Sequence, residues 1–180
     1  MICDMLPFCY KTAIDSKECL DCPNSIDKCI TICGNISNVK CEENGKVYIL
    51  NNTLGRHTIK YKIDGGVIKE DSSVPDGTNK CDFLYLINDK TAQVAILIEL
   101  KGKSINKAIT QLVGTLDIYR SFFNKFTSVY CRIVITSSTP KIKASPNYIN
   151  LRKTVQKLNG NVKIAEKRMI EKDIDLDYAQ

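Results

Sequence analysis

The chain has 180 residues, of which 43% are hydrophobic and 26% charged, proportions that are ordinary for a folded domain with a buried core. The formal net charge of +6 favours a polyanionic partner such as nucleic acid, although no run of five basic residues marks a dedicated patch. The first residues lack the pattern of a signal peptide and the longest apolar run, 94–98, is far shorter than a membrane span, so we expect an intracellular protein, cytoplasmic or nuclear, without a membrane partner.

The nine cysteines are concentrated at the start of the chain, where residues 1–41 hold seven of them and few large aliphatic side chains. We interpret residues 1–41 as a small cysteine-rich module that precedes an α/β domain over residues 46–180. An intracellular location argues against a disulfide framework. The most regular set is Cys19-x₂-Cys22-x₆-Cys29-x₃-Cys33, whose four thiolates suit tetrahedral Zn²⁺. An Fe–S cluster and a set of free or disulfide-paired cysteines are the alternatives.

The first predicted elements of the α/β domain are strands. Residues 58–64 alternate between apolar and polar side chains, which indicates a strand, and Asp64-Gly65-Gly66 is a turn signal after it. The only histidine, His57, precedes this strand and is expected to be structural. Residues 71–80 are predicted to form a loop, and residues 81–103 two apolar strands joined at residues 88–91.

Two helices and two further strands are predicted next. Ser104 can act as the N-cap of a helix, whose apolar stripe comprises Ile105, Ala108, Ile109, Leu112, Leu116, Tyr119 and Phe123. Residues 128–136 are rich in β-branched side chains and predict a strand. Ser145-Pro146 begins a second helix and Asn159-Gly160 ends it. With a final short strand over 161–170, the elements predict a mixed central sheet flanked by helices.

Three charged residues interrupt the two apolar strands of residues 81–103. If the turn is centred between Lys90 and Thr91, Asp82 and Glu99 face each other across the ladder, with Cβ atoms roughly 5 Å apart. Lys101 then lies on the same face, one pleat further along its strand. Two opposed carboxylates repel unless one is protonated or a cation lies between them. Mg²⁺ is commonly held by one or two carboxylates, with water and substrate phosphate completing the shell, so the pattern indicates phosphodiester hydrolysis.

The arrangement of Asp82, then Glu99-Leu100-Lys101 at a strand end, then a helix, resembles the PD-(D/E)xK nuclease superfamily, which includes restriction enzymes and Holliday-junction resolvases. The resemblance covers residues 58 to about 136. It implies a restriction-endonuclease-like fold in which Asp82 and Glu99 bind Mg²⁺ or Mn²⁺ and Lys101 is the catalytic lysine. Residue 81 is Cys, where the family's motif often has Pro. The extra acid that the family places on its first helix has three candidates here: Glu42, Glu43 and Asp64.

The resulting hypothesis is a divalent-metal-dependent nuclease that acts on DNA rather than RNA, in repair, recombination or defence. Gln111 corresponds to a glutamine that related nucleases direct at the site, and we predict that it and Lys103 contact nucleic acid. The alternative is a non-catalytic module that keeps the fold and binds nucleic acid or protein. A plain ion pair of Lys101 with Glu99 or Asp82 would suit that alternative, and a homodimer or a partner protein remains open.

Overall fold

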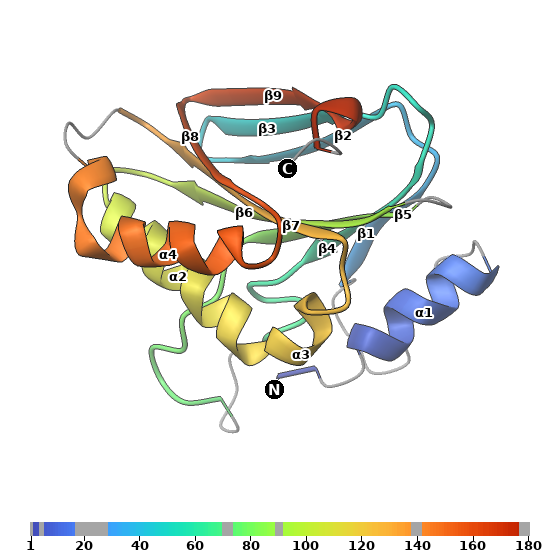
Figure 1. Cartoon of the computed structure of the whole chain (residues 1–180), viewed down its shortest axis with the longest axis horizontal. Coiled ribbons are helices and arrows are strands. Elements are labelled where there is room, and N and C mark those ends of the chain that lie inside the picture. The colour runs from blue at the N-terminus through green and yellow to red at the C-terminus, as the bar shows by residue number, and fades with distance from the viewer. Residues whose placement is uncertain are drawn as a thin grey trace.

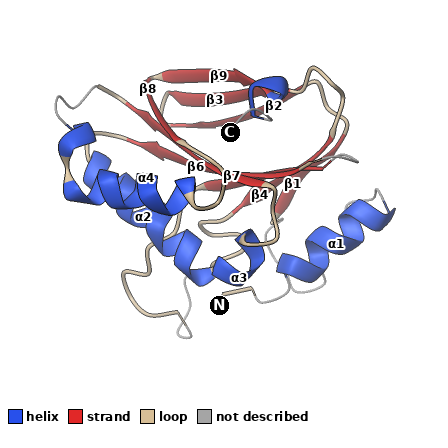
Figure 2. Ribbon diagram, viewed as in Figure 1, coloured by secondary structure: helices blue, strands red, loops and turns tan. Residues whose placement is uncertain are grey.

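A computed structural model describes residues 2–3, 6–16, 29–69, 74–88, 92–137 and 142–176 of the chain. Helices, a six-stranded sheet and a three-stranded sheet form three successive layers (Figures 1 and 2). The mixed α/β class predicted from the sequence is confirmed. The expectation that helices flank the central sheet is confirmed for one face only, because the small sheet covers the other face.

The central sheet has the strand order β1-β4-β5-β6-β7-β8. The first four strands in this order are antiparallel neighbours, whereas β6, β7 and β8 run parallel. Parallel neighbours require crossovers, and helices supply them on the covered face. The strand bounds are β1 Ile30–Gly34, β4 His57–Lys62, β5 Phe83–Asn88, β6 Gln93–Lys101, β7 Ser128–Ile135 and β8 Val162–Glu166.

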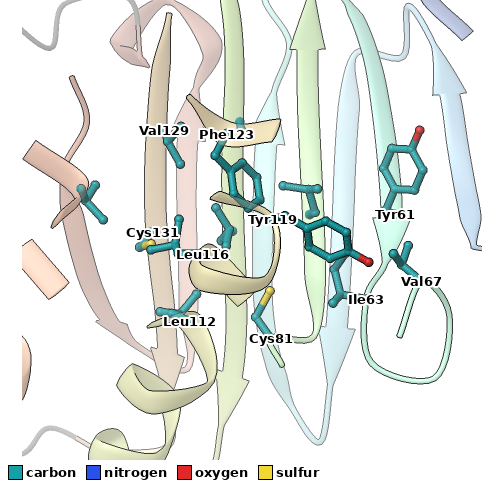
Figure 3. Close-up of a cluster of buried hydrophobic side chains, with 14 of the residues drawn as sticks. Tyr61, Ile63, Val67, Cys81, Leu112, Leu116, Tyr119, Phe123, Val129 and Cys131 are labelled. Atoms are coloured by element: carbon teal, nitrogen blue, oxygen red, sulfur yellow. The ribbon is translucent and has the colours of Figure 1, made fainter. Parts of the chain in front are cut away.

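The helical layer comprises α1 (Leu6–Ser16), α2 (Ile105–Ile118), α3 (Arg120–Phe123) and α4 (Pro146–Gln156), with short 3₁₀ turns at Ile142–Ala144 and Asp173–Leu176. Every side chain of the stripe predicted from Ile105 to Phe123 is buried, and Figure 3 shows several of them packed on the sheet. The helix is broken at Tyr119, where the prediction had one continuous stripe. Ser145 caps α4 as predicted, whereas Ser104 makes no side-chain cap hydrogen bond. No helix in the described ranges is long and apolar enough to cross a membrane.

The small sheet, in the order β2-β3-β9, was not predicted from the sequence. It consists of the hairpin β2 (Asn38–Glu43) and β3 (Lys46–Asn51), and of β9 (Arg168–Lys172), which pairs with β3 in parallel. Its buried side chains pack against the face of the central sheet that carries Tyr85, Ile96 and Tyr130. The predicted single strand over 161–170 is therefore wrong: β8 belongs to the central sheet and β9 to the small one, with Lys167 (φ 57°) between them.

The described parts of residues 1–41 lie within the same body as the α/β domain. β1 pairs with β4, and Leu6, Tyr10 and Ala13 of α1 belong to the core cluster between the helices and the central sheet. Cys19 and Cys22 lie outside the described residues, so the metal-binding module predicted for this segment stays a prediction.

Candidate active site

The strand register brings the motif residues together as predicted. In the β5–β6 pair, Leu84 lies opposite Leu97 and Asn88 opposite Gln93, which is the register expected of a turn centred between Lys90 and Thr91. The turn residues 89–91 lie outside the described ranges. Asp82 directly precedes β5, and its Oδ2 accepts a 2.6 Å hydrogen bond from the backbone N–H of Leu100 on β6. The same register, extended by one residue, places Asp82 opposite Glu99.

Glu99 occupies an unusual position for a carboxylate. It lies on β6 with Ala95 and Leu97, on the face that packs against the helices, and its exposed fraction is 0%. Neither of its carboxylate oxygens makes a hydrogen bond of good geometry with a described residue, although Lys101 and the backbone N–H of Asp82 lie close enough to lower its pKa. Lys101 Nζ lies 3.4 Å from Glu99 Oε1, with 25% of the Lys101 side chain exposed. The two residues share a face because side chains alternate along a strand.

Burial dominates the electrostatics of the two acids. Burial, aided by the negative charge of Asp82, raises the pKa of Glu99 to about 9, although Lys101 and the backbone N–H of Asp82 lower it. Burial likewise outweighs the lowering effect of the Leu100 N–H and leaves the pKa of Asp82 raised to about 6. An environment that keeps a carboxylate protonated at neutral pH penalises its negative charge. Either a proton or a bound cation can remove that penalty.

Glu43 and Asp64, two of the three candidates for the additional acid, influence the same site. The negative charges of both raise the pKa of Asp82. Glu43 ends β2 and Asp64 follows β4, so both acids come from strand ends near Asp82. The third candidate, Glu42, instead pairs with Lys40 at 2.5 Å. In the described ranges, no group of three His, Cys, Asp or Glu side chains is arranged to hold a metal ion.

Helix α2 fixes the segment that leads into Asp82. Gln111 is 9% exposed, and its Nε2 donates a 3.0 Å hydrogen bond to the carbonyl of Lys80. One turn later, Thr115 Oγ1 accepts a 2.8 Å hydrogen bond from the N–H of Cys81. Gln111 therefore lies near the site and holds its backbone, while its predicted contact with nucleic acid stays a prediction. Lys103 lies exposed between β6 and α2, and its predicted contact with nucleic acid likewise stays a prediction.

Two contacts of this segment were not predicted from the sequence. Lys80 is 5% exposed and its Nζ lies 3.4 Å from Asp64 Oδ1. Thr115 binds the backbone beside Asp82. Nothing in the pattern around Lys80 distinguishes it from a solvated loop lysine, but Thr115 follows Gln111 by four residues on the predicted helix, and that spacing places both on one face.

The predicted cysteine ligands are partly described. Cys29 and Cys33 are partly buried, and β1 has a bulge between Ile30 and Ile32. The N–H of Lys62 donates to the carbonyl of Cys29, whereas Cys33 pairs with Ile59. The partners of Cys29 and Cys33 on β4 are thus three residues apart, so the two cysteines lie about 10 Å apart along the strand direction. Cys81 and Cys131 are buried in the core.

In comparisons with known proteins, no family model, no curated protein and no solved structure matches the chain.

Proposed function

We propose that the protein is a metal-dependent nuclease of the PD-(D/E)xK kind, with Asp82 and Glu99 as metal ligands and Lys101 as the catalytic lysine. One observation carries the proposal. A fully buried glutamate lies opposite an aspartate at the end of a central strand, with the ammonium of Lys101 3.4 Å from one of its oxygens. A charged carboxylate in that position destabilises the fold unless a proton, an ion pair or a bound cation compensates it.

The donor set fits Mg²⁺ or Mn²⁺. These ions prefer carboxylate oxygens and are commonly held by one or two of them. The carboxylate oxygens of Glu99 and the Oδ1 of Asp82, whose Oδ2 accepts the hydrogen bond from Leu100, would supply the protein ligands. When bound, the ion would offset the two negative charges, lower the pKa of a bound water and polarise the phosphate.

The protein's own side chains would have separate tasks in this reaction. Asp82 is oriented by the N–H of Leu100, so its position is set by the hairpin itself. Lys101 is partly exposed at the rim while its ammonium reaches Glu99, so it can neutralise a phosphate or orient a water molecule. Gln111 and Thr115 hold the backbone from Lys80 to Cys81, and they act on the site as positioning residues.

The element order supports the proposed fold. β4, β5 and β6 form an antiparallel meander, α2 crosses over, and β7 returns parallel to β6. A restriction-endonuclease-like core has the same order, with the motif on the second and third strands. The additional acid would then come from Glu43 or Asp64, both at strand ends near Asp82, rather than from the first helix. We propose DNA as the substrate, in line with the net charge of +6.

The test is a cleavage panel with the full chain on linear duplex, branched and single-stranded DNA and on RNA, in Mg²⁺, Mn²⁺ or EDTA. We expect cleavage only with a divalent ion. Glu99→Gln and Lys101→Met should each reduce the rate about 100-fold or more, because each removes charge from the reacting centre. Asp175→Asn and Lys125→Ala are matched controls, since both residues are exposed and come from other parts of the chain.

Three outcomes would contradict the proposal: cleavage that survives both motif substitutions, cleavage that persists in EDTA, or no cleavage of any substrate. The last outcome, with metal-independent nucleic-acid binding, would favour the non-catalytic module. The 3.4 Å contact between Lys101 and Glu99 is the observation that favours this alternative, because the ammonium of Lys101 could neutralise Glu99 without a metal ion.

A further inference from the structure

The helical layer carries a large share of the chain's positive charge. Residues 146–160, which comprise α4 and the turn after it, contain Arg152, Lys153 and Lys157 and no acidic residue. Residues 117–124, at the end of α2 and in α3, add Arg120 and Asp117. The two segments together hold four basic residues and one acidic residue, a net charge of +3, which is half of the +6 of the whole chain.

These two segments face each other across one hollow of about 430 Å³. Figure 1 shows its helices, α2, α3 and α4, on the face of the central sheet opposite the small sheet. The polar part of the lining comes from both segments: Asp117, Arg120, Asn124, Asn150, Thr154 and Lys157. Apolar side chains of the same helices complete the lining. The fold thus gathers at one place charges that are scattered along the sequence.

The cations around this hollow are accessible to a partner. Lys153 and Lys157 are exposed on one side of α4, because residues four apart lie on the same face of a helix. Within the described ranges, neither lysine takes part in an ion pair. Arg120 Nη2 lies 2.6 Å from Asp117 Oδ1, but 73% of the Arg120 side chain is exposed. Exposed cations with a single acid among them attract a polyanion.

The residue types around the hollow favour the backbone of a duplex over a single strand. Proteins that bind single-stranded nucleic acid stack its bases on aromatic side chains. Here the aromatic side chains of the adjoining helices are buried: Tyr119, Phe122, Phe123 and Tyr148. The exposed amides of Asn124 and Asn150 lie with the cations in the lining instead. Basic and amide side chains are common partners of the phosphate oxygens of duplex DNA.

We propose that one surface, which we call the α3–α4 surface, binds the phosphate backbone of duplex DNA. Its residues are Arg120, Asn124, Asn150, Lys153 and Lys157. Because phosphates carry no sequence information, this surface would hold DNA of any sequence. The choice of DNA over other polyanions rests on the proposed nuclease function, whereas the place of the surface rests on its charge and shape.

The α3–α4 surface is separate from the proposed nuclease centre. Helix α2 begins at Ile105, shortly after Lys101 at the end of β6, and reaches the hollow at Asp117. Ile105 and Asp117 are about 18 Å apart along the helix axis, since each residue adds about 1.5 Å. A duplex bound at the hollow would therefore contact residues that take no part in the chemistry, and these contacts can be measured without it.

The test is the fluorescence anisotropy of a labelled 20-base-pair DNA duplex mixed with the full chain, in EDTA, at 50 and 200 mM salt. Three phosphate contacts predict an affinity about 40-fold weaker at the higher salt concentration. The double variant Lys153→Gln/Lys157→Gln should bind at least tenfold more weakly at 50 mM salt. Its affinity should then fall only about threefold between the two salt concentrations, because one cation remains.

Asp117→Asn should change the affinity in the opposite direction. It removes the one negative charge of the hollow and releases the guanidinium of Arg120 from its ion pair. We expect the duplex to bind about threefold or more tightly, measured in the same way. A residue with a merely structural role would not give a gain in affinity, so unchanged or weaker binding by Asp117→Asn would contradict the proposal.

The matched control is Arg168→Gln/Lys172→Gln, which removes the same charge from exposed positions on β9 in the small sheet. This variant should keep at least half of the natural affinity. Equal weakening by the two double variants would overturn the proposal, because net charge alone would then account for binding. All of the exchanged side chains are exposed, so melting curves by circular dichroism should match that of the natural chain.

Three further results would overturn the proposal: no binding of the duplex at 50 mM salt, tighter binding of a single strand of the same length, or equal displacement of the duplex by polyglutamate of the same total charge. The last result would show a surface for acidic proteins instead of DNA. Binding is measured without a divalent ion and without cleavage, so the nuclease proposal and this one can fail separately.

Discussion

The protein buries two glutamates in contrasting ways. Glu171 is 6% exposed and contacts Arg132, Lys163 Nζ at 2.7 Å and the hydroxyl of Tyr48 at 3.1 Å. Burial alone would raise its pKa, but the charges of Arg132 and Lys163 and their hydrogen bonds outweigh burial and hold the pKa of Glu171 below its usual value. Among the described residues, Glu99 has Lys101 at 3.4 Å and the backbone N–H of Asp82, and these do not outweigh burial, so its pKa stays raised. Unlike Glu171, Glu99 is therefore only partly compensated by its described neighbours.

Glu99→Gln should therefore stabilise the metal-free protein at alkaline pH. Because burial raises the pKa of Glu99 to about 9, the folded state keeps a proton that the unfolded chain releases above its usual pKa. The contribution of Glu99 to stability is then fully present below about pH 4.5 and is lost as pH rises towards 9. While Glu99 holds its proton, the loss is about 1.4 kcal/mol per pH unit, or about 3 °C in Tm.

The measurement is Tm by circular dichroism in EDTA at pH 5, 7 and 8.5. The natural chain should lose stability along this series, and Glu99→Gln should lose less and melt higher at pH 8.5. A divalent ion should raise the Tm of the natural chain but not that of Glu99→Gln. If the Lys101 contact already satisfies Glu99, the substitution will instead lower Tm at pH 8.5.

At the scale of elements, α2 positions the segment that carries Asp82. Gln111 and Thr115 bind the backbone of residues 80 and 81, and Gly114 lies between them against Asn79. A Cβ on Gly114 would lie 2.3 Å from the Asn79 carbonyl oxygen. Only glycine allows this approach, so one face of α2 acts as the support for the start of β5.

Gly114→Ala should destabilise the fold although alanine favours helix. The gain in helix propensity is about 1 kcal/mol. Forcing the helix from the Asn79 backbone costs more, at the upper end of about 1–3 kcal/mol, because the clash is with main-chain atoms rather than a flexible side chain. We expect a net loss of at least 1 kcal/mol in urea unfolding. Thr110→Ala, on the exposed side of α2, should change stability by less than about 0.5 kcal/mol. If Gly114→Ala is as stable as the natural chain, the loop that carries Asn79 moves aside without a measurable cost in stability.

The elements that the sequence predicted are those with strong periodicity and clear end signals. The stripe from Ile105, the Ser145-Pro146 cap and the polar break at residues 88–91 were sufficient to place α2, α4 and the β5–β6 register. The hairpin of β2 and β3 was missed because β2 is short and largely polar on its outer face, although Asn44-Gly45 between the strands, with φ positive at both residues, is a strong hairpin signal. The switch from β8 to β9 rests on the left-handed conformation of Lys167, a non-glycine residue that gives no such signal in the sequence.

At the scale of the whole molecule, one buried ionic cluster joins the two sheets. Arg132 lies on β7 of the central sheet and is 0% exposed, while Glu171 lies on β9 of the small sheet. Tyr48 on β3 and Lys163 on β8 complete the contacts of Glu171. Burying such charges is favourable only if each has its partners, so the cluster specifies how the small sheet is seated on the central one.

Glu171→Ala should cost about 3–5 kcal/mol, because it leaves Arg132 charged and buried without its carboxylate. The measurement is urea unfolding at neutral pH. Lys172→Ala, the exposed neighbour on β9, is the control and should change stability by less than about 0.5 kcal/mol. A loss below 1 kcal/mol for Glu171→Ala would show that water or a rearranged Arg132 compensates, and that the cluster does not determine the seating.

The parallel pairing of β3 with β9 also has a consequence for the order of events during synthesis. Tyr48 and Glu171, which meet between the sheets, are 123 residues apart in the chain. The β2–β3 hairpin therefore emerges from the ribosome long before the strand that completes its sheet. Until β9 is synthesised, the edge of β3 that pairs with β9 has no strand beside it. We therefore expect the β3–β9 pairing, which completes the small sheet, to be a late and slow step of folding.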